Sequence, residues 1–335
     1  MNQIPYPILF SHVYKDYIWG GRRIAEVFGR DDAPEVCAES WEISDRTQGM
    51  SVVANGPLKG RSLHDLTRDW GPRLVGADGS DASRFPLLIK IIDASRRLSV
   101  QVHPDEHSAA VSGGEPKTEC WTLLPGSAPD AYVFAGFREP MRPDDLKQRL
   151  AEESLEGSLR RLPVKPGDVV FVPGGRVHAI GEGCILLEVQ QNSNTTYRLY
   201  DWGRVGHDGK PRALHVRESI EVLDWDDTGA EPTPPLLLQE GEGRAVWSLV
   251  SCPFFHLRRI ELSSPAAFAQ DPSSFTILFA ARGAIRIGVG EHVERIPPGT
   301  SCLIPACAEE YRMEAESKTA RVIAIRTGPD PERKR

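Results

Sequence analysis

Short strand-like runs recur along most of this chain, and this repetition is the feature that most constrains its fold. Each run is rich in Val, Ile, Leu and aromatic residues and is bounded by Gly, Pro, Asp or Asn. The runs are SVVANG, FPLLIKIID, LSVQVHP, CWTLLPG, AYVFAGF, GDVVFVPGG and CILLEVQQ. Short strands at this spacing favour a sandwich or barrel over alternating βαβ units. The sequence therefore predicts a mainly β protein.

Three segments break this pattern and are expected to be helical. Ser62–Val75 carries apolar residues at helical spacing after a serine that is suited to an N-cap. Arg142–Leu162 is rich in helix formers, with a proline near its start. His215–Trp225 is a third, short helix candidate.

With 335 residues, the chain is long enough for more than one barrel-sized unit. The acidic, Pro- and Gly-rich stretch DDTGAEPTPPLLLQEGEG, beginning at Asp226, is typical of a linker, and a second set of strand-like runs follows it. We therefore expect an N-terminal domain over residues 1–225, with helical insertions. A linker over 226–244 and a second, barrel-like domain over 245–330 complete the expected division.

Charge and composition exclude several classes of function. The formal net charge is −7, so neither nucleic acid nor an anionic membrane is an expected partner. The start of the chain lacks a basic segment followed by a long apolar one, and no apolar run is long enough to span a bilayer. The six cysteines form no CxxC pair, which favours buried thiols in a reducing compartment. We expect a cytoplasmic protein.

The segment LSVQVHP predicts a strand with one polar face. Because side chains alternate along a strand, Ser99, Gln101 and His103 share a face, while Val100 and Val102 point to the other. Buried polar groups of this kind need a metal, a substrate or water as partners. The alternative is an exposed polar face on an edge strand.

A second segment, from Gly167 to His178, predicts a strand, a Pro/Gly turn and a return strand that carries a histidine. It resembles the cupin motif G-x5-P-x-G-x2-H without a gap. Glu119 lies at the start of another apolar run, where it is either a surface residue at a strand entrance or a ligand to a cation. Gln101, His103, Glu119 and His178 together offer two imidazoles, a carboxylate and an amide, a set that suits a divalent transition metal.

Two further patterns leave alternatives open. Arg198 lies among aromatic residues in the run TTYRLYDW, where it could bind an anionic oxygen or form an ion pair with Glu188 or Asp201. The Pro-Gly opening and the Gly-to-Pro spacing of the cupin motif recur at Gly299–Pro305, with Glu310 at the place of His178. The recurrence suggests two barrels, the second without metal ligands, although one short match can arise by chance.

Several long motifs in one order resemble the type I mannose-6-phosphate isomerases in their short bacterial form. The motifs are YKDYIWGG, AESWEIS, LSVQVHPDE, KTECW, PGDVVFVPGGRVHAIGEG and LLEVQQNSNTTYRLYDWGR. They extend from about Tyr14 to about Val222, and the cupin-like tail fits as well. One departure is Gly174-Gly-Arg, where many relatives carry Ala-Gly-Thr.

The resemblance implies a bicupin, with two jelly-roll barrels, that binds one Zn²⁺ per chain. It implies an aldose–ketose isomerase that interconverts mannose 6-phosphate and fructose 6-phosphate through an enediol. The implied zinc ligands are Gln101, His103, Glu119 and His178. The implied catalytic residues are Lys117, Glu188 and Arg198, with the base open between the first two. Ser99 and Lys90 are implied to bind substrate, with Arg204 and Lys210 as looser candidates for the phosphate.

Three other readings compete with this one. The chain could be a cupin that senses a sugar phosphate without turnover, or an isomerase of another phosphorylated sugar. His103, His178 and Glu119 could also mimic the facial triad of a metal-dependent dioxygenase. A small sugar phosphate is the expected partner, and the chain is expected to be a monomer or a homodimer.

Overall fold

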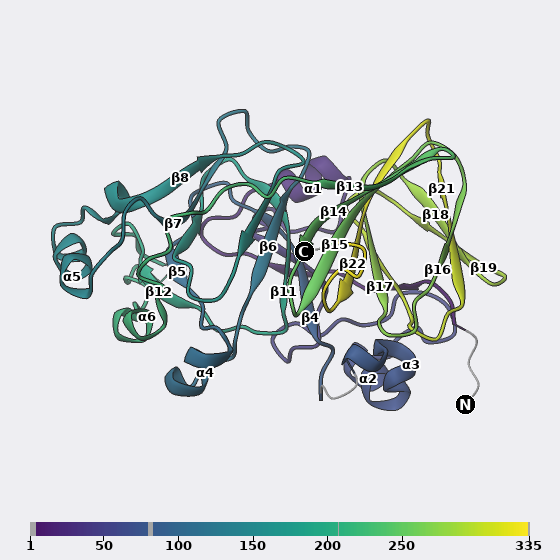
Figure 1. The fold of residues 1–335 in the computed structure, drawn as a ribbon, viewed down its shortest axis with the longest axis horizontal. Coiled ribbons are helices and arrows are strands. Elements are labelled where there is room, and N and C mark those ends of the chain that lie inside the picture. Colours follow the sequence, from purple (N-terminus) through teal and green to yellow (C-terminus); the bar gives the residue numbers. More distant parts are fainter. Residues whose placement is uncertain (1–4, 80–82, 207, 334–335) are drawn as a thin grey trace. The chain divides into compact units, whose positions relative to one another are not determined.

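The computed structural model describes residues 5–79, 83–206 and 208–333 and confirms a mainly β protein (Figure 1). The chain divides into two compact units. Unit 1 comprises Met1–Val13, Trp41–Lys90 and Pro234–Arg335, and unit 2 comprises Tyr14–Ser40 and Ile91–Thr233. Strands β2 (Val13–Lys15), β3 (Glu39–Ile43) and β4 (Leu87–Asp93) carry the chain from one unit to the other.

Unit 2 contains two antiparallel arrays of strands. One is a five-stranded sheet in the order β12-β5-β10-β7-β8, and in the other β6 lies between β11 and β9. The strands of the first array are β5 (Val100–Val102), β7 (Tyr132–Phe137), β8 (Leu159–Pro163), β10 (His178–Ile180) and β12 (Tyr197–Tyr200). Those of the second are β6 (Glu119–Leu123), β9 (Val169–Val172) and β11 (Ile185–Gln191).

Both faces of the five-stranded sheet are covered. Trp121 and Leu186 of the second array pack in one apolar cluster with Val133 and Ile180 of the sheet. On the other face, Val100 and other sheet residues pack with residues of α5 and α6. The alternation predicted for LSVQVHP is therefore present, with its valines turned toward helices and its polar positions turned toward the space between the arrays.

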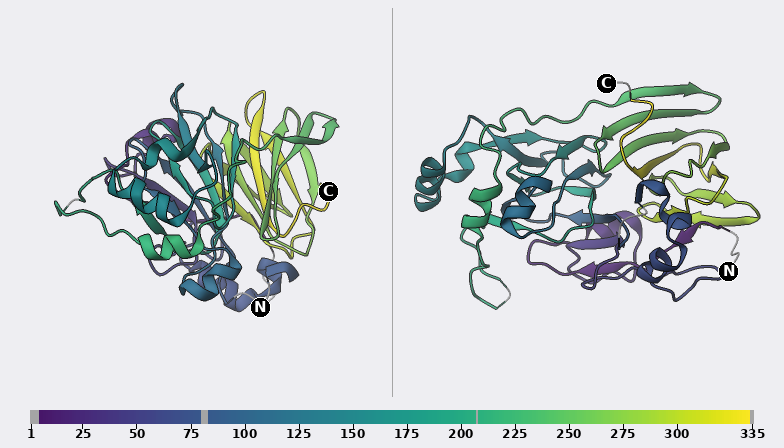
Figure 2. Two further views of the ribbon diagram at one scale, coloured as in Figure 1. Left: turned by 60° about the vertical axis from the view of Figure 1, so that its left-hand side comes forward. Right: turned by 60° about the horizontal axis from the view of Figure 1, so that its bottom comes forward.

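Unit 1 is a second two-sheet structure. Its sheets have the orders β1-β20-β17-β22-β15-β14-β13 and β16-β21-β18-β19. The strands of the first are β1 (Ile8–Leu9), β13 (Leu236–Gly241), β14 (Arg244–Ser251), β15 (Phe255–Leu262), β17 (Thr276–Arg282), β20 (Ser301–Ile304) and β22 (Ala320–Thr327). Those of the second are β16 (Ala266–Ala269), β18 (Ile285–Val289), β19 (His292–Ile296) and β21 (Glu310–Ala315). Figure 2 shows the strands from β13 to β22, coloured green to yellow, from two further sides.

The core of unit 1 lies between its two sheets. Leu278 and Val322 of the larger sheet pack in one apolar cluster with Ile287 and Met313 of the smaller sheet. All four side chains are buried because alternate positions along each strand point inward.

Helices form at the three predicted places, with different lengths. The first is interrupted at Gly71, whose φ of +50° ends one helix before Pro72 begins another. The second is much shorter than expected because the chain turns at Glu153 and continues as β8. The helices are α1 (Arg23–Phe28), α2 (Leu63–Trp70), α3 (Pro72–Val75), α4 (Glu106–Ser112), α5 (Pro143–Ala151) and α6 (Val216–Val222), with 3₁₀ turns η1 (Ala77–Gly79) and η2 (Leu155–Ser158). Among the described residues, no helix is long and apolar enough to cross a membrane.

The expected linker over residues 226–244 is partly ordered as a strand. Residues Leu236–Gly241 form β13, which pairs with β14 through a turn at Gly241 and Gly243, both with positive φ. The apolar run LLL within the acidic stretch supplies the strand, and the glycines supply the turn. The SVVANG run differs as well, since residues 51–56 contribute isolated bridges instead of a named strand.

A core truncation in unit 1 should lower the stability of the protein strongly. Leu278→Ala removes methyl groups from the fully buried cluster between the sheets, so we expect a loss of about 2–5 kcal/mol in the free energy of unfolding. Val293→Ala is the matched control, because Val293 is 55% exposed and its truncation should cost less than about 0.5 kcal/mol. Urea unfolding of the two variants measures the difference, and equal losses would contradict this description of the core.

Candidate metal centre

Strand pairing in unit 2 places three of the predicted site residues in one row. Gln101 on β5 lies opposite His178 on β10 and, on its other side, opposite Arg198 on β12. Residues directly opposite each other in a sheet point to the same face. His103 follows β5 and shares the face of Gln101 by alternation.

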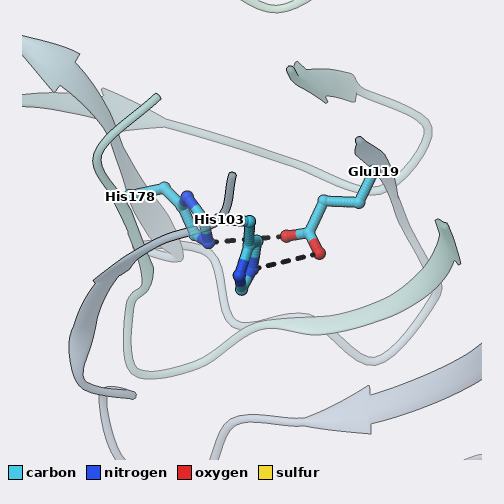
Figure 3. Close-up of side chains that lie close together, drawn as sticks. All are labelled: His103, Glu119 and His178. Carbon is cyan, nitrogen blue, oxygen red and sulfur yellow. Dashed lines mark ion pairs between the residues drawn. The ribbon is translucent and has the colours of Figure 1, made fainter. Parts of the chain in front are cut away.

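Glu119 joins this group from the other array of unit 2. It lies at the start of β6, and its carboxylate is 3.5 Å from His103 Nε2 and 3.5 Å from His178 Nε2 (Figure 3). The three side chains are buried, and one ligand atom from each lies within 4.8 Å of the others. Gln101 completes the set, with its amide nitrogen 3.2 Å from His178 Nε2. The structure thus brings together all four predicted metal ligands.

The electrostatics of the cluster favour the protonation states that a metal requires. Burial, followed by the charge of Lys117, lowers the pKa of His103 to about 3, and burial also lowers the pKa of His178. Burial alone would raise the pKa of Glu119, but the charge of Lys117 and the two histidines together hold it well below its usual range. At neutral pH the cluster therefore offers two neutral imidazoles and a carboxylate.

The orientation of His178 also suits a metal ligand. Its Nδ1 lies 2.8 Å from the carbonyl oxygen of Arg176, and because a carbonyl can only accept, Nδ1 carries the proton. The lone pair of Nε2 then points toward Glu119, as in metal-bound histidines whose other nitrogen donates to the backbone. Two nitrogens, a carboxylate and an amide fit a divalent transition ion such as zinc.

Lys117 lies at the edge of this cluster. Its Nζ is 2.8 Å from the Glu119 carboxylate and 3.0 Å from His103 Nε2, and the side chain is buried. Its backbone N–H donates to Pro104 O, which fixes the residue next to the end of β5. Lys117 is therefore placed to contact a molecule bound at the metal ligands.

Glu188 and Arg198 lie on the strands that flank the cluster. Glu188 is buried on β11 and accepts a hydrogen bond of 3.2 Å from the indole N–H of Trp121. Arg198 donates to Ala213 O at 2.9 Å and, within the described residues, makes no ion pair with a carboxylate. The predicted alternative, an ion pair of Arg198 with Glu188 or Asp201, is therefore not formed.

Asp201 instead pairs with Arg204 and Arg212, each at 2.5 Å. Burial would raise the pKa of Asp201, but hydrogen bonds from these two guanidiniums lower it. Arg204 also donates to Arg97 O, so its charge is engaged in holding this loop. Lys210 is exposed in the same loop, and no ion pair of its side chain is found in the part of the chain described here.

The two remaining candidates are buried. Ser99 directly precedes β5, two residues before Gln101, and alternation gives both the same face. Lys90 lies on β4, and its ammonium is 5.3 Å from the centre of the Trp41 ring. Lys90 belongs to unit 1, whereas Ser99 belongs to unit 2.

A hydrogen-bonded clamp that the motifs do not reveal holds the segment carrying Lys117 and Glu119. The Thr118 N–H donates to Gln191 Oε1 at 2.7 Å, and the Thr118 hydroxyl accepts from the Gly174 N–H at 3.3 Å. Gln190, fully buried opposite Glu119, donates through Nε2 to Ser193 O at 2.7 Å and fixes the turn after β11. The only sequence signal for this clamp is the pair of amides in EVQQN, next to Glu188.

Comparison with known proteins decides the family. A model of the phosphomannose isomerase type I catalytic domain matches residues 8–133, and a mannose-6-phosphate isomerase cupin-domain model matches residues 246–324. The mannose-6-phosphate isomerase ManA of Bacillus subtilis is 36% identical over 92% of this chain and 96% of its own length. This chain belongs to the type I phosphomannose isomerase family. A mannose-6-phosphate isomerase of Streptococcus mutans is 37% identical, with the same coverage.

Solved structures of phosphomannose isomerases share the fold. The crystal structure of the Bacillus subtilis mannose 6-phosphate isomerase superposes with a TM-score of 0.86 at 30% identity, over 96% of this chain and 99% of the other. A variant of the Salmonella typhimurium phosphomannose isomerase superposes with a TM-score of 0.76 at 17% identity, over 97% and 100% of the two chains. Together with the match to the cupin-domain model, these structures confirm the bicupin expected from the sequence.

The two buried histidines predict an acid-sensitive metal-free protein. The pKa of His103 is lower in the folded state than the unfolded value of about 6.5, so only the unfolded state takes up the proton between pH 6.5 and 3. Stability should therefore fall as the pH falls through this window. At pH 5.5, His103 alone should account for about 1.4 kcal/mol of the loss relative to neutral pH.

Urea unfolding of the chelated protein at pH 7.5 and pH 5.5 tests this expectation. His103→Gln should show a smaller loss between the two pH values than the unsubstituted protein. A His107→Gln control, in which an exposed histidine of α4 is replaced, should keep the full loss. An unchanged pH dependence in His103→Gln would contradict the assignment.

Proposed function

We propose that this member of the family interconverts mannose 6-phosphate and fructose 6-phosphate with one zinc ion per chain. The observation that carries the proposal is the buried cluster of His103, Glu119 and His178, with Gln101 beside it, in a chain whose relatives are named for this enzyme. A zinc ion held by these four residues would polarise the oxygens at C1 and C2 of the open-chain sugar.

The reaction moves a proton between C1 and C2, so it needs a group that exchanges that proton. Lys117 and Glu188 are the two candidates, because both are buried in unit 2 on the strands or loops that surround the cluster. Arg198 shares the row of Gln101 and would stabilise the negative charge that develops on the enediolate oxygen. Its guanidinium has no carboxylate partner among the described residues, which leaves its charge available for an anionic group.

The phosphate requires basic or hydroxyl groups at the other end of the sugar. We propose Ser99 and Lys90 for this role, with Arg204 and Lys210 as additional contacts. Arg204 is already paired with Asp201, so we expect it to contribute less to phosphate binding than an arginine without such a pair would. We also propose residues 1–225 as the metal-binding domain, within which Tyr14–Ser40 and the residues from Ile91 onward belong to unit 2. Residues 245–330 would form the barrel-like domain without metal ligands.

The proposed setting of the enzyme is the cytoplasm. All six cysteines are free thiols, and five of them are buried. Free thiols persist in a reducing compartment, which supports this setting.

A coupled assay of the purified protein on mannose 6-phosphate tests the proposal. Turnover should be lost on chelation and restored by adding zinc. Restoration by iron with oxygen uptake would favour a dioxygenase instead. Absence of turnover with zinc bound would direct the search to another phosphorylated sugar, and binding of mannose 6-phosphate without turnover would support a sensor.

A further inference from the structure

The inner face of unit 1 changes from apolar to polar along its strands. On β15, Ile260 belongs to the apolar core, and the inward positions before it are Arg258 and His256. On β22, Ala324 belongs to the core, and the next inward position is Arg326, which lies opposite His256. The alternation that buries apolar side chains elsewhere therefore places charged ones inside at this end.

A cavity of about 330 Å³ lies at this polar end. His256, Arg258, Arg326, Tyr311, Phe268 and Thr276 contribute to its walls, and all belong to unit 1. The volume lies at the small end of the range for ligand pockets, about 300–1,000 Å³. None of the motifs that define the metal centre contributes to this cavity.

Two polar side chains of the wall are almost fully buried, yet each keeps an unused hydrogen-bonding group. His256 and Tyr311 are both 5% exposed. His256 Nδ1 donates to Gly328 O at 2.9 Å, so Nε2 is left as an acceptor, and burial lowers the pKa of this imidazole, which keeps it neutral. Within the described residues, neither His256 Nε2 nor the Tyr311 hydroxyl has a hydrogen-bond partner. A ligand in the cavity would supply both.

The charges of the wall are already compensated. Arg258 pairs with Asp330 at 2.5 Å and with Glu332 at 2.9 Å, and Arg326 pairs with Asp271 at 3.2 Å. A phosphate would have to displace one of these carboxylates to reach a guanidinium. The cavity therefore favours a neutral, polar ligand over an anion.

The remaining wall is aromatic. Phe268 on β16 stacks on Tyr311 of β21, with ring centres 5.3 Å apart and planes inclined by 11°. Aromatic rings beside hydrogen-bonding groups suit a molecule with both C–H and hydroxyl groups. A hydroxyl can donate to His256 Nε2 and accept from the Tyr311 hydroxyl, which an anionic oxygen or a purely apolar group cannot do.

We propose that the interior of unit 1 binds a neutral polyhydroxylated molecule of hexose size, at a site formed by His256, Tyr311 and Phe268. This site is additional to the proposed isomerase centre. Binding at this site does not depend on turnover. Absence of binding here and absence of isomerase activity can therefore be observed separately.

Calorimetric titration of the zinc-loaded, full-length protein with D-mannose tests the site. Tyr311→Phe removes only the hydroxyl, and His256→Asn keeps a donor for Gly328 O while removing the Nε2 acceptor. Each variant should bind mannose about tenfold more weakly, the loss expected for one hydrogen bond. Isomerase activity on mannose 6-phosphate should stay within about twofold of the unsubstituted protein in both variants.

Matched controls separate this site from others. His292→Asn and Tyr132→Phe change a histidine and a tyrosine outside the cavity and should leave mannose affinity unchanged. No detectable mannose binding, or equal binding by the unsubstituted protein and Tyr311→Phe, would overturn the proposal. Mannose binding lost in Arg198→Ala but kept in Tyr311→Phe would assign the sugar to the metal centre and overturn it too. If Tyr311→Phe weakens the binding of mannose 6-phosphate while mannose itself does not bind, the site takes an anionic ligand and the proposal of a neutral ligand is contradicted.

Discussion

Replacing His178 with alanine should abolish metal-dependent isomerisation. The substitution removes one of two buried imidazoles that face the Glu119 carboxylate. Only three of the four proposed ligands would then remain to hold the ion. Loss of the polarising ion should cost about 4 kcal/mol of transition-state stabilisation, equivalent to about 10³-fold in kcat/KM. The variant should also retain less than a stoichiometric amount of zinc after dialysis.

Zinc content and turnover on mannose 6-phosphate, measured on the same preparation, check this expectation. His107→Ala is the control, because His107 is an exposed histidine on α4. It should keep both the metal and the activity. A His178→Ala protein with stoichiometric zinc and full turnover would refute the assignment of the ligand.

Replacing Arg198 with alanine should lower kcat by about 10²–10³-fold, the effect expected when a charged group that stabilises an oxyanion is removed. Arg198→Lys should recover part of the loss, because it keeps the charge but not the planar guanidinium. KM should change less than kcat if the charge acts mainly in the transition state.

Steady-state kinetics of the two Arg198 variants, with Arg217→Ala as the control, measure this effect. Arg217 lies exposed on α6 and pairs with Glu221. Thermal unfolding should show similar stability in all of them, since Arg198 is only partly buried on β12 and its hydrogen-bond acceptor, Ala213 O, belongs to an exposed residue. A loss confined to KM would instead assign Arg198 to phosphate binding.

The alternation of a few strands made much of the fold and the metal centre predictable. In LSVQVHP, every second residue carries a polar group, and the structure buries the intervening valines on the opposite face. The Pro/Gly turn before His178 predicts a return strand, and β10 begins at that histidine. Local patterns of this kind predict which side chains share a face, because side-chain direction in a strand alternates with position.

Contacts between distant segments were not predictable in this way. The clamp between Thr118 and Gln191 joins residues 73 positions apart, and nothing in either segment specifies the partner. Arg204 illustrates the opposite difficulty, since its basic character suggested phosphate binding while its partner, Asp201, is only three residues away. In an irregular loop, a short separation in sequence does not determine which side chains meet.

The predicted length of the helix that became α5 was wrong for a related reason. Residues 142–162 are rich in helix formers, but propensity is a weak force that tertiary packing overrides. Leu159 and Leu162 are buried on β8, where pairing with β7 satisfies the backbone. The burial of these leucines in a sheet outweighs their preference for a helix.

The position of strand β1 near the start of the chain has a consequence for the order in which the two units fold during synthesis. It lies at the edge of the larger sheet of unit 1, where Ile8 and Leu9 pair with Leu303 and Cys302. A ribosome produces β1 almost three hundred residues before its partner strand, about 15–60 seconds earlier at about 5–20 residues per second. All of unit 2 emerges within that interval. Unit 2, which carries the candidate metal ligands, can therefore fold before β1 of unit 1 has a partner strand with which to pair.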